Sequence, residues 1–221
     1  MLGETLGLLG VVNGSLSLGI ERLLRMCGIP VPEDKGRKYL FRGKEFFPFD
    51  GIWIARPQDM PEAVLQGKVV AGFSGEDWIA ESGLSGFSIP ALFPFSKGRM
   101  EAAQIVVLGK PGQEFEDTRK VTVYTEYPRL ARLRYRKAKI VRVYGAAEAW
   151  VVIGEEKDVA VDLFDLGSTA AANDLVRIGD PIMVSRAAFF AREDSPSLPK
   201  ITAFARKLQE AFARLANKQG G

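Results

Sequence analysis

A turn rich in hydroxyl groups, placed between a strand and a helix, is the part of the chain best suited to bind an anion. Residues 159–163 form an apolar run with the β-branched content of a buried strand. Gly167, Ser168 and Thr169 follow it, where a helix over residues 169–174 can begin. Unpaired N–H groups collect at the positive end of a helix, and a phosphate can accept hydrogen bonds from them. The turn predicts a phosphate site, and an ordinary capped helix after a strand is the alternative interpretation.

Histidine is absent from the 221 residues, and Cys27 is the single cysteine. This composition excludes Ser-His-Asp and Cys-His catalysis and any zinc site built from imidazoles and thiolates. A metal would have to be a hard cation such as Mg²⁺, held by oxygens and chiefly by the phosphates of the substrate. We therefore expect an enzyme of this composition to work by positioning and electrostatics.

The composition is that of a globular protein with a real core, since 47% of the residues are hydrophobic. The net charge of +3 is mild, so anionic small molecules are favoured as partners and nucleic acid is not expected. No apolar run is long enough to span a membrane, and the Leu-Gly-rich start carries Glu4 in place of a basic segment. The lone cysteine forms no intramolecular disulfide. We expect a soluble protein of the cytoplasm.

Strand and helix patterns alternate along the chain, which predicts an α/β protein with mostly parallel sheets. The expected strands are residues 6–12, 52–55, 69–73, 104–108, 120–124, 140–143, 159–163 and 181–185. The expected helices are a stripe over residues 16–27, one from about Pro57, one with Ser74 as its N-cap, and those over 128–138, 146–153 and 199–216. Breaks near residues 96–98 and 179–181 predict two lobes. Lobe one comprises residues 1–100 and 182–221, and residues 101–181 form an inserted lobe two.

Four blocks, in this order, resemble the ATP phosphoribosyltransferase family in its short form. Residues 55–61 read Ala-Arg-Pro-Gln-Asp-Met-Pro, and residues 72–77 read Gly-Phe-Ser-Gly-Glu-Asp. Residues 125–132 read Thr-Glu-Tyr-Pro-Arg-Leu-Ala-Arg, and residues 162–173 fall on the family's loop for phosphoribosyl pyrophosphate (PRPP). The resemblance extends from about Val11 to Arg192.

The resemblance implies a two-lobed fold like that of type II periplasmic binding proteins, with substrates in a cleft between the lobes. It implies an enzyme that joins N1 of ATP to C1 of PRPP with the assistance of Mg²⁺, in the first step of histidine biosynthesis. It also implies a homo-oligomer and a separate regulatory subunit resembling histidyl-tRNA synthetase.

The resemblance also implies which residues bind the substrates. They are Asp162, Gly167, Ser168, Thr169 and Asn173 in the PRPP loop, Arg56, Asp59, Ser74 and Gly75 in the first two blocks, Asn13, Gly14 and Ser15 after the first strand, Arg99 between the lobes, and Glu148 at a helix start. Alternative interpretations are a capping arrangement for Arg56 and Asp59 and an exposed first-turn acid for Glu148. We expect Trp53, Trp78 and Trp150 in the core rather than stacked on a nucleobase.

The chain departs from the family in one direction, toward less positive charge. Asp165 and Leu166 replace a serine and a threonine, Ala171 replaces an arginine, and residues 12–15 read Val-Asn-Gly-Ser in place of Pro-Lys-Gly-Arg. A carboxylate about 4 Å from a phosphate costs about 1 kcal/mol at the dielectric constant of water and about 4 kcal/mol at an effective value of about 20. Each lost hydrogen bond from a charged group costs roughly 1.5–3 kcal/mol.

Replacement cations are Lys97, Arg99 and the seven basic residues of the run 129–142. That run also fits a solvated helix face with Leu130, Leu133 and Ala138 turned inward. Three functions stay open on the sequence. They are a diverged transferase, a non-catalytic paralogue that binds a nucleotide or another anion and regulates a partner, and a small-ligand-binding module or other enzyme on the same fold.

Overall fold

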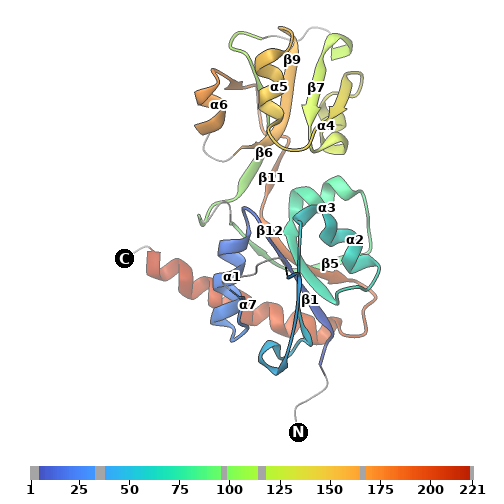
Figure 1. Ribbon diagram of the computed structural model, residues 1–221, viewed down its shortest axis with the longest axis vertical. Helices are drawn as coiled ribbons and strands as arrows, with labels where there is room; N and C mark the ends of the chain where they lie inside the picture. Colours follow the sequence, from blue (N-terminus) through green and yellow to red (C-terminus); the bar gives the residue numbers. More distant parts are fainter. Residues whose placement is uncertain (1–4, 33–37, 96–98, 114–117, 165–167, 220–221) are drawn as a thin grey trace. The chain divides into compact units, whose positions relative to one another are not determined.

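The computed structural model describes residues 5–32, 38–95, 99–113, 118–164 and 168–219, and it divides into two compact units (Figure 1). Unit 1 comprises Met1–Ala102 and Arg186–Gly221, and unit 2 comprises Ala103–Ser185. Each unit holds one six-stranded sheet with helices packed on it. None of the helices in the described ranges has the length and apolar character needed to cross a membrane.

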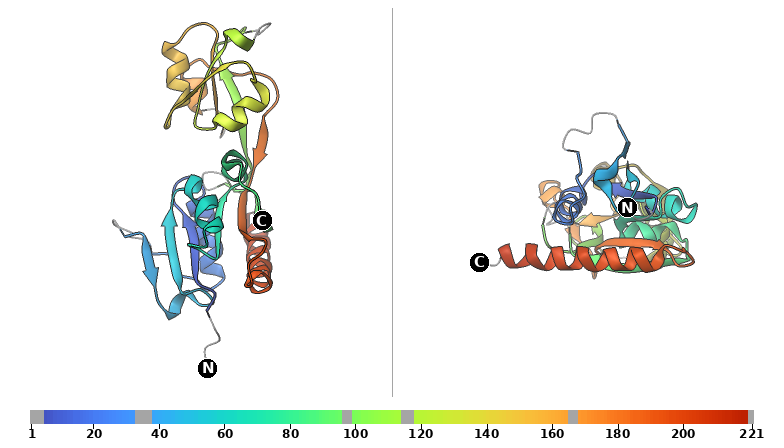
Figure 2. Two further views of the ribbon diagram at one scale, coloured as in Figure 1. Left: turned by 90° about the vertical axis from the view of Figure 1, so that its right-hand side faces the viewer. Right: turned by 90° about the horizontal axis from the view of Figure 1, so that it is seen from below.

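Unit 1 has a sheet with the strand order β2-β3-β1-β4-β12-β5. Its strands are β1 (Leu8–Val12), β2 (Leu40–Arg42), β3 (Gly51–Ala55), β4 (Ala71–Gly75), β5 (Phe87–Phe93) and β12 (Ala187–Arg192). Its helices are α1 (Ser17–Met26), η1 (Lys44–Phe46), η2 (Pro57–Asp59), α2 (Met60–Leu65), α3 (Glu76–Ser82) and α7 (Leu198–Gln219). The helix α7 lies along one side of this sheet (Figure 2), where it packs on β5, β12 and α1. Aromatic rings pack between α7 and the sheet, and the ring centroids of Phe189 on β12 and Phe204 on α7 lie 5.9 Å apart.

Unit 2 has a sheet with the strand order β10-β6-β9-β7-β8, and β11 also pairs with β6. Its strands are β6 (Ala103–Gly109), β7 (Thr122–Thr125), β8 (Lys139–Arg142), β9 (Asp158–Phe164), β10 (Val176–Arg177) and β11 (Met183–Ser185). Its helices are η3 (Thr118–Lys120), α4 (Pro128–Arg134), α5 (Ala147–Ile153) and α6 (Ser168–Ala172). The helix α5 packs on β9, β7 and β6 through Ala147 and Val151, which are fully buried.

The predicted α/β class is confirmed, but the expectation of mostly parallel sheets is wrong. In unit 1, β1 runs parallel to β3 and β4, whereas β2, β12 and β5 pair antiparallel. In unit 2, β7 runs parallel to β8 and β9, whereas β6, β10 and β11 pair antiparallel. The parallel strands are joined through crossover helices. Antiparallel pairing requires no such crossover. The strands next to the two segments that join the units can therefore run in the opposite direction, and these strands are β5, β6, β11 and β12.

The predicted strand over residues 181–185 exists but lies in the other unit from the one we expected. Met183 of β11 is opposite Ile105 of β6, so this strand belongs to unit 2. The chain passes to unit 1 only after Ser185. Gly179, with φ of +66°, belongs to a turn inside unit 2, where Arg134 donates a hydrogen bond of 2.8 Å to the carbonyl of Asp180. A glycine and proline break that looked like a boundary is therefore an internal turn.

Candidate functional site

Apart from Arg99, the binding residues that we predicted for unit 1 lie at or just beyond the carboxyl ends of its parallel strands. Asn13 follows β1, Arg56 follows β3, and Gly75 is the last residue of β4. The strand β1 lies between the other two, and its last residue, Val12, is opposite Ala55 of β3. Ligands of α/β sheets bind outside the carboxyl ends of the strands. The three segments therefore form one edge suited to a ligand.

The segment after β1 combines a glycine turn with a buried, unpaired oxygen. The Asn13 amide N–H donates to the Ala55 carbonyl at 3.0 Å, and Gly14 has a φ of +89°. The Gly14 carbonyl accepts hydrogen bonds from the N–H and the hydroxyl of Ser17, at 3.1 and 2.8 Å, where α1 begins. The Asn13 Oδ1 atom is buried and has no hydrogen-bond partner among the described residues. A buried acceptor without a donor costs about 1–3 kcal/mol, so a donor from a ligand or water is favoured here. Ser15 is exposed.

Ser74 connects two parts of this edge, and its predicted role as an N-cap is wrong. The strand β4 continues to Gly75, and Gly75 is the N-cap residue of α3. The fully buried Ser74 hydroxyl instead donates a hydrogen bond of 2.7 Å to the carbonyl of Pro57. This bond joins β4 to η2, the short helix that follows Arg56.

Arg56 precedes η2 and Asp59 is its last residue, and both side chains are exposed. Neither side chain caps the helix that follows it, so the capping interpretation is wrong. The Arg56 guanidinium makes no ion pair or hydrogen bond with another residue of the described ranges. It is therefore available to an anion at the carboxyl edge of β3.

The carboxyl ends of the parallel strands in unit 2 bring three carboxyl groups together. Glu126 follows β7, Asp162 lies near the end of β9, and Glu148 lies in the first turn of α5. Thr125 is opposite Val161 of β9, which places Glu126 beside Asp162. Glu126 Oε1 accepts a hydrogen bond from the N–H of Gly145.

Asp162 is the most perturbed acid of this group. Burial raises the pKa of Asp162 to about 7, assisted by a hydrogen bond with Glu148 and by the charges of Glu148 and Glu126. A hydrogen bond of 2.7 Å from the Leu163 N–H to Asp162 Oδ1 lowers this pKa in part. Glu148 Oε2 is buried and has no partner among the described residues. Glu148 is therefore a half-buried partner of Asp162, and its interpretation as an exposed first-turn acid is wrong.

These acids do not make a metal centre. In the described part of the chain, no group of three or more acids or cysteines is arranged to hold a metal ion.

The segment predicted to bind PRPP is described in part. The helix α6 begins at Ser168, one residue before its predicted start, and ends at Ala172. The N–H of Asn173 donates a hydrogen bond of 3.1 Å to the Ala170 carbonyl, which closes this short helix. Gly167, Asp165 and Leu166 lie outside the described residues, and so does Lys97. Arg99 is exposed in the segment between β5 and β6.

Two expectations about apolar side chains near these edges are wrong. Leu133 on α4 is 65% exposed, although Leu130 and Ala138 are buried as predicted. The buried residues of α4 are Leu130 and Ala131, so its apolar face does not extend to Leu133. Trp150 on α5 is 47% exposed and stacks on Tyr124 with ring centroids 5.5 Å apart, so it is not a core residue. Trp53 and Trp78 are partly buried.

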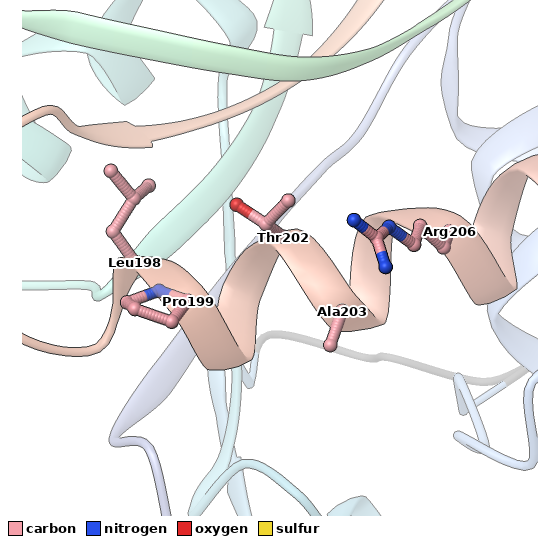
Figure 3. A pocket seen from close by; sticks show the side chains of 5 residues that line it. All are labelled: Leu198, Pro199, Thr202, Ala203 and Arg206. Atoms are coloured by element: carbon pink, nitrogen blue, oxygen red, sulfur yellow. The ribbon is translucent and has the colours of Figure 1, made fainter.

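Three hollows lined by described residues of unit 1 contain none of the predicted binding residues. One of about 380 Å³ is lined by five side chains of α7 alone, including Thr202 and Arg206 (Figure 3). None of the predicted binding residues lines it. A hollow with one helix as its wall offers little enclosure to a ligand.

An ion pair that we did not predict fixes the start of α3. Arg186 and Glu76 form two hydrogen bonds, from Nε to Oε2 at 2.7 Å and from Nη2 to Oε1 at 2.9 Å. These bonds raise the pKa of Arg186. The residues are 110 positions apart, and the sequence holds no signal that pairs them.

Comparison with known proteins shows which family the chain resembles. The family model for ATP phosphoribosyltransferase (HisG) matches residues 56–215. An ATP phosphoribosyltransferase from Saccharophagus degradans is 32% identical over 174 residues, covering 76% of this chain and 77% of that protein.

The solved structures agree on the fold. A chain of the ATP phosphoribosyl transferase (HisG:HisZ) complex from Thermotoga maritima matches with a TM-score of 0.77 and 23% identity, over 95% of this chain and 100% of that one. Arginine-bound ArgBP from T. maritima matches with a TM-score of 0.53 and 13% identity, over 92% and 95% of the two chains. The predicted two-lobed fold of the periplasmic-binding-protein type is confirmed. Because the family model covers more than two thirds of the sequence, this chain belongs to the ATP phosphoribosyltransferase family.

Proposed function

We propose that this chain is the catalytic subunit of an ATP phosphoribosyltransferase, which joins N1 of ATP to C1 of PRPP and releases pyrophosphate in the first step of histidine biosynthesis. The observation that carries the proposal is the position of the family's blocks. Each block spans the carboxyl end of a strand that belongs to a parallel set, namely β3, β4, β7 or β9. That edge is where α/β proteins bind ligands.

The chemistry suits a chain without histidine. Displacement at C1 of PRPP builds positive charge on the ribose and negative charge on the departing pyrophosphate. Such a reaction is accelerated by aligned reactants and by fixed charges at the place where charge develops. A divalent cation supplied with the substrate would neutralise charge on the pyrophosphate oxygens.

The two edges suit different parts of the substrates. In unit 1, the exposed Arg56 guanidinium and the N–H groups at the start of α1 can donate to phosphate oxygens. In unit 2, Asp162 and Glu148 can accept hydrogen bonds from hydroxyl groups such as those of ribose. A carboxylate repels phosphate, so we assign this pair to a sugar and the cations to the phosphates.

A non-catalytic paralogue is the second candidate, and the substitutions at two described positions favour it. Asn13 and Ala171 stand where the family has cations, and Asn13 presents a neutral buried oxygen instead. Such a protein would bind a nucleotide or another anion and regulate a partner. In either role, we propose a regulatory subunit resembling histidyl-tRNA synthetase as the partner.

An assay of phosphoribosyl-ATP formation separates the candidates. With ATP, PRPP and Mg²⁺, a transferase forms product only when both substrates are present, and Arg56→Ala lowers the rate at least about tenfold. Lys68→Ala is the matched control, because Lys68 is an exposed cation of the same unit that precedes the amino end of β4. Calorimetric titration with each substrate completes the test. Binding without product supports the paralogue, and absence of binding of both substrates contradicts the transferase.

A further inference from the structure

The backbone of Arg56 is held on both sides, although its side chain is not held. Arg56 is exposed, and its guanidinium makes no ion pair or hydrogen bond with another residue of the described ranges. The residue before it, Ala55, accepts a hydrogen bond of 3.0 Å on its carbonyl from the Asn13 N–H. The residue after it, Pro57, accepts one of 2.7 Å from the Ser74 hydroxyl. These two flanking bonds therefore set the direction in which the guanidinium leaves the edge of the sheet.

The proline at position 57 transmits its hydrogen bond to Arg56. A proline ring fixes the φ of its own residue and restricts the residue before it to extended backbone. Arg56 has this conformation, with φ of −76° and ψ of 147°. Because few torsions are free between the two residues, a tether on the Pro57 carbonyl also limits the movement of Arg56.

Ser74 is a rigid anchor that a ligand cannot reach. It belongs to β4, which lies between β1 and β12 in the sheet, and it is opposite Ala188 of β12. Its side chain is fully buried, so no ligand at the edge touches it. A serine hydroxyl carries a single proton, and Ser74 donates it to the Pro57 carbonyl. Any influence of this hydroxyl on a ligand therefore passes through the segment that it holds.

The segment has a second anchor at Met60, which is fully buried. Gly10 of β1 is opposite Gly72 of β4, and a Cβ atom at Gly72 would lie 2.7 Å from the sulfur of Met60. The two glycines thus let α2 lie close to the sheet. The Met60 N–H also donates a hydrogen bond to the Pro57 carbonyl. Loss of the serine hydroxyl would therefore leave η2 closed and α2 in place, and would loosen the end of the segment that carries Arg56.

We propose that Ser74 is a positioning residue for an anion site at the carboxyl edge of unit 1, and that it acts on the anion only through Arg56. The inference rests on the proposed function in one respect, which is that the Arg56 guanidinium donates to phosphate. A guanidinium that already points toward its ligand loses less conformational entropy on binding. Without the tether from Ser74, the anion itself must order this segment, and affinity falls.

Calorimetric titration with inorganic pyrophosphate tests the proposal. Pyrophosphate stands for the phosphates of either substrate, and its binding is measured without any transfer reaction. Ser74→Ala should weaken binding about threefold to tenfold, and Arg56→Ala should weaken it at least about tenfold. The variant with both changes should bind no more weakly than Arg56→Ala alone, because the hydroxyl has no effect once the guanidinium is absent.

Ser82→Ala is the matched control. The Ser82 hydroxyl also donates a hydrogen bond of 2.7 Å to a backbone carbonyl, that of Ile79, and it accepts one from the Leu84 N–H. Ser82 is the last residue of α3, whose first residue follows the carboxyl edge. Ser82→Ala should lower the free energy of unfolding at least as much as Ser74→Ala does, as measured by urea unfolding. It should leave the affinity for pyrophosphate unchanged, because no bond that it removes holds Arg56.

The pattern of affinities decides the outcome. Wild-type affinity in Ser74→Ala, a further loss in the double variant, or an equal loss in Ser82→Ala overturns the proposal. Absence of pyrophosphate binding by the wild type also overturns it. If the predicted pattern is found but the wild type forms no phosphoribosyl-ATP, the positioning role of Ser74 is supported and the proposed transferase function fails.

Discussion

The Thr125 hydroxyl donates a hydrogen bond of 2.6 Å to the Val161 carbonyl and accepts one of 2.8 Å from the N–H of Tyr127. Thr125 is fully buried, at the end of β7. One hydroxyl therefore joins the ends of β7 and β9 and fixes the turn that carries Glu126 beside Asp162. The geometry of the unit 2 edge depends on this side chain.

Replacement of this hydroxyl should destabilise the protein. Thr125→Val keeps the shape but leaves the Tyr127 N–H without its acceptor, which costs roughly 1–3 kcal/mol in the free energy of unfolding. Thr125→Ser keeps the hydroxyl and loses one methyl group, at a cost of about 1 kcal/mol. Urea unfolding of the three proteins measures both values. A valine variant as stable as the serine variant would contradict the role assigned to the hydroxyl.

Asp162 should make the stability of the protein depend on pH. Its pKa is about 7 in the folded state, above the ordinary value of 3.8. The folded state therefore holds the proton of Asp162 more tightly than the unfolded state does. The contribution of this proton to the free energy of unfolding is fully present below pH 3.8 and is lost as pH rises through 7. Asp162→Asn should remove this loss and be more stable than the wild type at pH 8, by roughly 2–4 kcal/mol at about 1.4 kcal/mol per pKa unit.

The measurement is urea unfolding of both proteins at pH 5 and pH 8. Asp180→Asn, at an exposed acid of the same unit, is the control and should leave the pH dependence as it is in the wild type. An equal pH dependence of the free energy of unfolding in the wild type and in Asp162→Asn would contradict the raised pKa assigned to Asp162.

The strands with strong local signals could be predicted from the sequence. The β-branched runs of β3 and β9 were predicted to within one residue at each end. The strand β5 was missed because it contains Pro90, which argues against a strand. Proline is tolerated there because β5 is the last strand of its sheet. The strand β12 was missed because its Ala-Ala-Phe-Phe-Ala run is buried throughout and shows no alternation.

The candidate site could be predicted only to the level of strand ends. Blocks such as the one around Arg56 lie where the sequence placed them, because the end of a parallel strand is a local feature. The proximity of Asp162 to Glu148, and the pairing of Glu76 with Arg186, depend on register and on packing between distant segments. No residue type or spacing encodes such contacts.

The pairing of Arg186 with Glu76 should be sensitive to geometry as well as charge. Arg186→Lys keeps the charge but cannot form the two parallel hydrogen bonds, so it should cost about 0.5–1 kcal/mol after allowance for solvent exposure. Asp194→Asn, which removes the exposed partner of Arg192, should change the free energy of unfolding less. Thermal unfolding of the two variants and the wild type, at low and at high salt, measures both changes in the free energy of unfolding. A larger effect at Asp194 would contradict the importance given to the Arg186 contact.

Restored charge on α6 should strengthen PRPP binding if this chain is a transferase. Ala171 is exposed on this helix, where the family has an arginine. A guanidinium can contact phosphate through two hydrogen bonds, so Ala171→Arg should tighten binding about tenfold to a hundredfold, from roughly 1.5–3 kcal/mol. Asp165→Ser should tighten it further by removing a repelling carboxylate. Ala172→Arg is the control, because it adds the same charge one residue along the helix, about 100° around its axis. Calorimetric titration with PRPP and Mg²⁺ gives the affinities. Equal gains from both arginine variants would mean that nonspecific charge attraction, and not a contact at position 171, governs binding.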